Sequence, residues 1–113
     1  MPLRLSKPEA AFQRAVLAFA NLHGWRTAHF RPGLNRRGQW QTAVQGDGAG
    51  FPDLVLVRER VVWAELKSDR GKVSAEQQEW INALCRAGQE VYVWRPTPGD
   101  WEEIEMVLGR NGE

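Results

Sequence analysis

Two short apolar runs joined by three charged residues constrain the fold more than any other part of the sequence. Residues 53–57 and 61–67 are rich in Val and Leu, and Arg58, Glu59 and Arg60 connect them. β-Branched runs with so short a polar connection predict a β-hairpin. Apolar residues occupy consecutive positions in both runs, so both faces of the hairpin carry them. The sequence therefore predicts a sheet that is covered on both sides.

The other predicted elements alternate between helices and strands. Apolar residues at three- and four-residue spacing predict helices, and apolar runs bounded by Gly or Pro predict strands. Residues 32–52 contain five glycines and form a long predicted loop, a type of segment that often carries function. The remaining elements are a helix over 6–23, strands over 25–31 and around 41–44, a helix over 74–87, a strand over 90–95 and a short helix over 100–108. Leaving the short strand in the loop aside, the predicted order is αβββαβ followed by a C-terminal helix.

Both longer helices begin with a capping-box pattern. Ser6 is followed three residues later by Glu9, and Ser74 is followed three residues later by Gln77. In such a box the Ser side chain and the Glu or Gln side chain each bind a free backbone N–H of the first turn. Helix capping is therefore one interpretation of Glu9 and Gln77, and it does not exclude a second role for either side chain.

Composition indicates one ordinary globular domain over residues 1–113. The chain has 42% hydrophobic and 26% charged residues, which argues against a disordered chain. A single cysteine, Cys85, excludes an intramolecular disulfide and favours a reducing, cytoplasmic setting. Cys85 lies on the apolar stripe of the predicted helix over 74–87 and is expected in the core. Neither a run of 18 apolar residues nor a secretory signal occurs, so we expect no membrane association.

Charge is distributed unevenly along the chain. Residues 1–72 hold twelve basic and six acidic residues, a net charge of +6, whereas residues 73–113 hold three basic and eight acidic residues, a net charge of −5. A polyanion such as nucleic acid would therefore contact surface built from the first part of the chain.

Three charged side chains interrupt the apolar hairpin near its open end. Glu65 and Lys67 are two residues apart on one strand, so both side chains leave the same face. If the connection is a three-residue turn that pairs Val57 with Val61, Asp53 lies opposite Glu65, with Cβ atoms about 5 Å apart. A two-residue turn would shift the register by one and send Asp53 to the other face.

Two carboxylates at this separation repel each other unless a cation lies between them. Mg²⁺ binds one or two carboxylates together with water and substrate phosphate, and Asp53 and Glu65 match that preference. A bound cation of this kind lowers the pKa of its water and polarises a phosphoryl oxygen, and Lys67 can orient the water or neutralise developing negative charge. The pattern therefore predicts hydrolysis of a phosphodiester.

These residues also resemble a known motif. The segments Gly50-Phe51-Pro52-Asp53 and Glu65-Leu66-Lys67 resemble the motif of the PD-(D/E)XK nuclease superfamily. The chain also resembles the VRR-NUC branch of that superfamily, over roughly residues 6–95. This resemblance rests on residues 65–72, the segment Ser74-Ala75-Glu76-Gln77, Trp80 and an opening helix with an early Glu. The resemblance implies an α/β, restriction-endonuclease-like fold: an αβββαβ core with a mixed central sheet flanked by helices, here with a short C-terminal helix. It also implies a stand-alone domain of the type found in bacteria and bacteriophages.

The resemblance assigns roles to residues of this chain. Asp53, Glu65, the backbone carbonyl of Leu66 and Glu9 would bind Mg²⁺ or Mn²⁺. Lys67 would assist catalysis, and Gln77 matches a further motif residue. Some relatives of this type resemble Holliday-junction resolvases and act as homodimers, so branched DNA and a homodimer are the expected partners.

Four basic residues outside the motif are candidate phosphate contacts: Arg31, Arg36, Arg37 and Lys72. Phosphate contacts position DNA without reading its bases, so structure-selective cutting is expected rather than sequence-specific cutting. Two other interpretations stay open. In the first, the chain is a DNA-binding module that keeps the nuclease fold without catalysis. In the second, it is a core-packed interaction protein whose charges lie on the surface.

Overall fold

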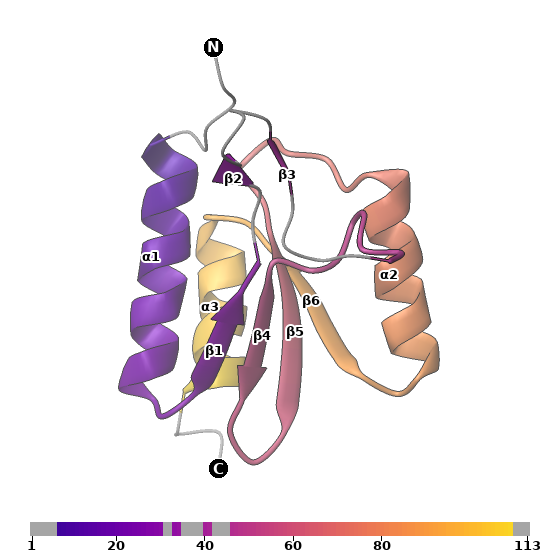
Figure 1. Cartoon of the computed structure of the whole chain (residues 1–113). Helices are drawn as coiled ribbons and strands as arrows, with labels where there is room; N and C mark the ends of the chain where they lie inside the picture. The colour runs from indigo at the N-terminus through magenta and orange to yellow at the C-terminus, as the bar shows by residue number, and fades with distance from the viewer. Residues whose placement is uncertain (1–6, 31–32, 35–39, 42–45, 110–113) are drawn as a thin grey trace.

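The computed structural model describes residues 7–30, 33–34, 40–41 and 46–109 (Figure 1). Its elements are α1 (Lys7–Leu22), β1 (Arg26–His29), β2 (Gly33–Leu34), β3 (Trp40–Gln41), β4 (Leu54–Val57), β5 (Val61–Leu66), α2 (Ala75–Arg86), β6 (Glu90–Trp94) and α3 (Pro98–Leu108). The predicted order is confirmed, with β2 and β3 as an additional small pair within the long loop. Ser6, the predicted cap of the first helix, lies outside the described residues.

The central sheet has the strand order β1-β4-β5-β6. Strands β1, β4 and β5 pair antiparallel, whereas β6 runs parallel to β5 after a crossover through α2. The sheet is therefore mixed, as the restriction-endonuclease-like class requires. Helix α3 begins two residues earlier than predicted because Thr97 caps it through Asp100 N and Pro98 fits the first helical turn.

The hairpin of β4 and β5 has the three-residue connection on which the predicted register depends. Val57 pairs with Val61 and Leu54 pairs with Ala64. Inside the connection, Arg58 N donates to Arg60 O at 3.0 Å. Continuing this register by one residue places Asp53 opposite Glu65.

One face of the sheet forms the core with α1 and α3. Leu54 and Leu56 of β4 and Val62 and Ala64 of β5 are all fully buried, and they alternate along the strands as side chains on one face must. Phe12, Val16 and Ala20 follow each other at four-residue spacing along α1, and with Ile104 and Leu108 of α3 they complete the same cluster. Figure 1 shows α1 and α3 on the same side of the sheet, with α2 on the other.

The second face is covered less than the sequence predicts. Val57 and Val61 are exposed, and Trp63 is half-buried. Helix α2 packs mainly against β6 at the edge of the sheet, and along this fully described helix Leu84 is the buried residue. The prediction that Cys85 belongs to the core is wrong for this reason: α2 contacts the sheet through one narrow line of residues and leaves Cys85 exposed.

Two arginines of the hairpin turn contact backbone carbonyls near the C-terminal ends of α1 and α3. Arg58 Nη1 donates to the carbonyl of His23 at 3.1 Å, and Arg60 Nη2 donates to the carbonyl of Val107 at 2.8 Å. Both guanidinium groups lie over the Trp25 ring, 4.7 and 5.3 Å from its centroid. Arginines at the C-terminal carbonyls of helices are electrostatically favourable. Within the described residues, none of the helices combines the length and the apolar character needed to cross a bilayer.

Adjacent residues of β4 test which face holds the core. Leu56→Ala should lower the free energy of unfolding by about 2–5 kcal/mol, because Leu56 is fully buried and its loss leaves a cavity. Val57→Ala, at a side chain 39% exposed, should cost less than about 1 kcal/mol. Urea unfolding followed by circular dichroism measures both. Equal losses in the two variants would contradict the assignment of the two faces.

Candidate active site

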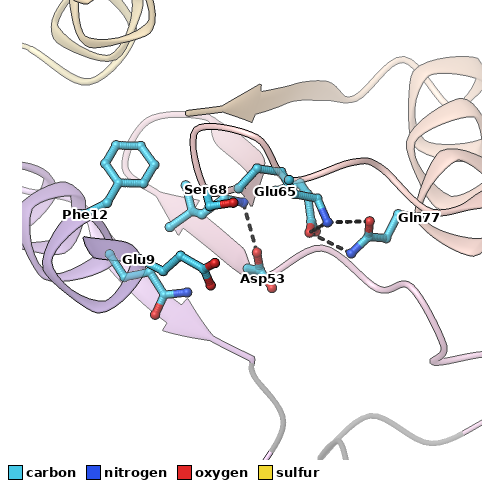
Figure 2. Close-up of a pocket in the computed structure, with 10 residues that line it drawn as sticks. Glu9, Phe12, Asp53, Glu65, Ser68 and Gln77 are labelled. Carbon is cyan, nitrogen blue, oxygen red and sulfur yellow. Dashed lines mark hydrogen bonds and ion pairs between the residues drawn. The ribbon is translucent and has the colours of Figure 1, made fainter. Parts of the chain in front are cut away.

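The predicted site residues converge on one pocket of about 230 Å³ at the open end of the hairpin (Figure 2). Its lining residues come from the start of β4, the end of β5 and the starts of α1 and α2. The side chains of five predicted site residues, from four segments of the chain, are among those that line it: Glu9, Asp53, Glu65, Lys67 and Gln77. Leu66, whose carbonyl the motif implies as a ligand, lines the same pocket. These residues are far apart in the sequence, so the fold is what brings them together.

Glu65 is the most deeply placed charged group of the pocket, with 2% of its surface exposed. Its Oε2 accepts a hydrogen bond from Gln77 Nε2 at 2.8 Å and forms an ion pair with Lys67 Nζ at 3.3 Å. Its Oε1 is buried and has no hydrogen-bond partner among the described residues. A buried oxygen without a hydrogen-bond partner destabilises the fold. Glu65 therefore brings one unused acceptor oxygen to the pocket that it lines.

Asp53 is held in place by the neighbouring strand. Its Oδ2 accepts a hydrogen bond from the backbone N–H of Leu66 at 2.9 Å. Its own carbonyl accepts from Phe30 N at 2.6 Å, which extends the pairing of β1 and β4 by one residue. Pro52, just before it, is fully buried. Asp53 is therefore held through its backbone by β1 and through its carboxyl group by β5, at the register position that faces Glu65.

Gln77 joins the helix cap to the site. Its Oε1 accepts from Ser74 N at 2.8 Å and from Lys67 Nζ at 2.6 Å, while its Nε2 donates to Glu65. The backbone N–H of Gln77 donates in turn to Ser74 Oγ at 3.1 Å, which completes the predicted capping box. One amide thus caps α2 and bridges Glu65 to Lys67.

Glu9 reaches the pocket from the first turn of α1. Figure 2 shows its carboxylate directed toward Asp53. Burial is the main cause of the raised pKa of Asp53, and the charge of Glu9 adds a small contribution in the same direction. Gln13, one turn further along the same helix face, is buried and also lines the pocket. The prediction from sequence did not single out Gln13. Its four-residue spacing from Glu9 is the signal that could have found it.

Burial and mutual repulsion control the charge of the two carboxyls. Burial, and then the negative charge of Asp53, raise the pKa of Glu65 to about 7, although Lys67 opposes the shift. Burial likewise raises the pKa of Asp53, against the Leu66 N–H and Lys67. Both groups therefore favour their neutral forms more than ordinary carboxyls do, which is the expected behaviour where a positive charge is needed to complete a site.

The donor set fits a hard divalent cation. Asp53, Glu65 and the Leu66 carbonyl offer oxygen, and in the described part of the chain the buried Glu65 Oε1 has no hydrogen-bond partner. Within that same part, no group of three or more His, Cys, Asp or Glu side chains is arranged so that it could hold a metal ion. Mg²⁺ suits such a sparse set, because it binds through one or two carboxylates and keeps several waters.

The structure describes one of the four predicted phosphate contacts, Lys72, and this residue does not line the pocket. Lys72 is exposed on the loop that follows Lys67. Arg31, Arg36 and Arg37 lie outside the described residues. Arg95, which the sequence did not single out, donates from Nη2 to the carbonyl of Gly71 at 2.7 Å and so holds the loop that borders the pocket.

Comparison with family models decides the wider relationship. The model of the VRR-NUC domain matches residues 13–98, which is most of the chain. The chain belongs to the VRR-NUC domain family. This family is of the PD-(D/E)XK-like nuclease type, so the chain carries a nuclease-family domain, and such a domain implies DNA binding.

The matched range contains Asp53, Glu65, Lys67 and Gln77, whereas Glu9 precedes it. The resemblance stated from the motif residues is therefore confirmed at the level of the family. A search of the curated proteins finds no match.

The stability of the metal-free protein should depend on pH through Glu65. A carboxyl whose pKa rises from 4.5 to about 7 on folding binds more protons in the folded state, so stability falls as pH rises across that interval. Glu65→Gln is neutral at every pH and should remove about 3 kcal/mol of this loss, since the pKa rises from 4.5 to about 7 and one pKa unit corresponds to about 1.4 kcal/mol.

Thermal unfolding in EDTA at several pH values measures the effect. Asp53 shifts in the same direction, so some pH dependence should persist in Glu65→Gln. Glu79→Gln, at an exposed position on α2, is the matched control and should keep the wild-type pH dependence. The same pH dependence in Glu65→Gln and wild type would contradict the assignment.

Proposed function

We propose that this chain is a metal-dependent nuclease that hydrolyses DNA phosphodiester bonds at the pocket of Asp53, Glu65 and Lys67. The observation that carries the proposal is the buried Glu65, with one oxygen bound by Gln77 and Lys67 and the other without a hydrogen-bond partner in the described chain. A packed structural carboxylate would have both oxygens satisfied. Membership of the VRR-NUC family supports the same reaction class.

Each residue has a role in the proposed site. Asp53 and Glu65 would hold Mg²⁺ or Mn²⁺, with the Leu66 carbonyl and Glu9 as further ligands. When bound, the cation would supply a Lewis acid for the phosphate and a water of lowered pKa. In hydrolysis the water oxygen bonds to phosphorus, the phosphorus–oxygen ester bond breaks, and a proton goes to the leaving oxygen.

Lys67 provides the positive side chain of the proposed site. Its Nζ is directed by Gln77 Oε1 and Glu65 Oε2, so the ammonium is fixed before substrate arrives. A positioned cation stabilises negative charge as it develops on the phosphate. Gln77 acts through Lys67 and Glu65, and we assign it a positioning role.

We infer further that the enzyme is an endonuclease selective for DNA structure, similar to Holliday-junction resolvases. Lys72 and the arginines at positions 31, 36 and 37 would contact phosphates, which provide affinity without base readout. Two symmetric incisions require two sites related by a two-fold axis, so we propose a homodimer. We also propose that residues 1–113 form one nuclease domain. The cytoplasmic location stays a prediction from the sequence.

A panel of DNA substrates tests the proposed reaction. Linear duplex, single strand, splayed arm, flap and four-way junction are incubated with Mg²⁺, Mn²⁺ or EDTA, and products are resolved on denaturing gels. We expect metal-dependent cleavage, with the four-way junction preferred. Lys67→Ala should lower kcat by about 100-fold or more, because it removes an electrostatic contact to the reacting phosphate.

Arg86→Ala is the matched control for loss of one positive charge, since Arg86 is exposed in the last turn of α2. It should cleave at the wild-type rate. Calorimetry with Mn²⁺ separates the alternatives: binding that is lost in Glu65→Ala supports the metal site. DNA gel shifts without cleavage would favour a non-catalytic binding module, and the catalytic assignments would then fail.

The homodimer is tested by analytical ultracentrifugation. At micromolar concentration we expect a species of twice the 12.9 kDa protomer mass, alone or with junction DNA. A 12.9 kDa monomer in both samples would count against paired incision by a stable dimer.

A further inference from the structure

We propose that Gly50 is a positioning residue that sets the start of α2 against the segment leading into Asp53, and thereby places Gln77 in the site. This inference rests on the proposed nuclease function. It concerns segment 47–51, which Figure 1 shows lying against α2. The reason for a glycine at this position is the closeness of two backbones.

Gly50 leaves no room for a side chain. A Cβ atom built on it would lie 2.6 Å from Gln77 N and 2.7 Å from Glu76 O, with the carbonyl carbon of Glu76 closer still. All three are backbone atoms of the first turn of α2, so no side-chain rotation can relieve the contact. The φ angle of Gly50 is also +81°, a conformation that other residues adopt at a cost. Any larger residue must move α2 and segment 47–51 apart.

Two further contacts connect the same pair of segments. Trp80 Nε1 donates to the carbonyl of Asp47 at 2.9 Å. The rings of Phe51 and Trp80 pack edge to face, with centroids 4.9 Å apart. Trp80 lies three residues after Gln77, on the neighbouring turn of the helix. Segment 47–51 therefore contacts α2 on two successive turns.

The core does little to hold this end of the helix. Leu84, the buried residue of the fully described α2, lies seven residues after Gln77, about 10 Å along the axis. Segment 47–51 therefore positions the first turn of α2 together with the hydrogen bonds that Gln77 makes to Lys67 and Glu65. Gly50 is three residues before Asp53, so the contact also fixes the distance between the Asp53 strand and the Gln77 helix.

Displacement of this turn would act on Lys67 and Glu65 through Gln77. Gln77 holds Lys67 Nζ at 2.6 Å and Glu65 Oε2 at 2.8 Å, and neither hydrogen bond survives a shift of about 1 Å. Errors of this size in a reacting geometry can lower rates by about 100-fold. Gly50 touches no substrate in this proposal, and its effect is entirely on the placement of the amide.

Gly50→Ala is compared with Gly46→Ala, a matched control in the same loop. Gly46 also has a positive φ, +72°, but a Cβ there meets nothing within 4 Å. Both variants carry the cost of a left-handed alanine, so both should lower the thermal unfolding midpoint. Only Gly50→Ala should lower kcat, by about tenfold or more, on the DNA substrate that the wild type cuts, with a smaller change in KM.

Coupling to Gln77 distinguishes positioning from a general loss of structure. In a Gln77→Ala background, Gly50→Ala should cause little further loss of kcat, because the amide it positions is gone. Trp80→Phe provides a milder variant in case Gly50→Ala does not fold, since it keeps a ring against Phe51 and removes the bond to Asp47. It should lower kcat several-fold, and again not in the Gln77→Ala background.

The ¹H–¹⁵N signals of the Gln77 side-chain amide report its hydrogen bonds without any cleavage. They should shift in Gly50→Ala and match the wild type in Gly46→Ala. Matching kcat values and matching amide signals in the two glycine variants would overturn the inference, as would a full loss of kcat that persists in the Gln77→Ala background. If the wild type cuts no substrate, the proposed function fails, and the amide signals still decide the positioning by Gly50.

Discussion

The register of the β4–β5 hairpin is the constraint on which the rest of the site depends. Val57 pairs with Val61 across a three-residue turn, and this pairing aligns Asp53 with Glu65. A slip of one residue would turn Leu54 and Leu56 out of the core and send Asp53 to the opposite face. Burial of two leucines stabilises the register by several kcal/mol. The hydrophobic core therefore holds together two carboxyl groups that would otherwise repel each other.

Glu65 is a buried carboxyl group whose hydrogen-bonding capacity the fold satisfies only in part. Lys67 and Gln77 satisfy one carboxylate oxygen, and the other has no hydrogen-bond partner in the described chain. If the side chain at position 65 had no function in the pocket, the protein would be more stable with an apolar or a fully hydrogen-bonded residue there. Departures from ordinary packing of this kind tend to occur where a protein does chemistry.

The two ends of the molecule are held by different kinds of contact. At the hairpin turn, Arg58 and Arg60 bind helix carbonyls over the buried Trp25. At the pocket, hydrogen bonds of polar side chains and the close approach of Gly50 to α2 replace such packing. Geometry at the pocket therefore depends on a few short contacts, which makes it sensitive to single substitutions that the core would tolerate.

Local patterns in the sequence were enough to predict the hairpin and the Ser74–Gln77 capping box, because strand alternation and helix caps act over a few residues. The facing positions of Asp53 and Glu65 followed only on condition of a three-residue turn, which the structure supplies. Local patterns did not predict that Cys85 is exposed, that Gln13 lines the pocket, or that the Gln77 amide joins Glu65 to Lys67. These facts depend on how α2 packs against β6 at the edge of the sheet and how α1 packs against β1 and α3. Packing between distant segments decides such placements, and no spacing within one segment encodes it.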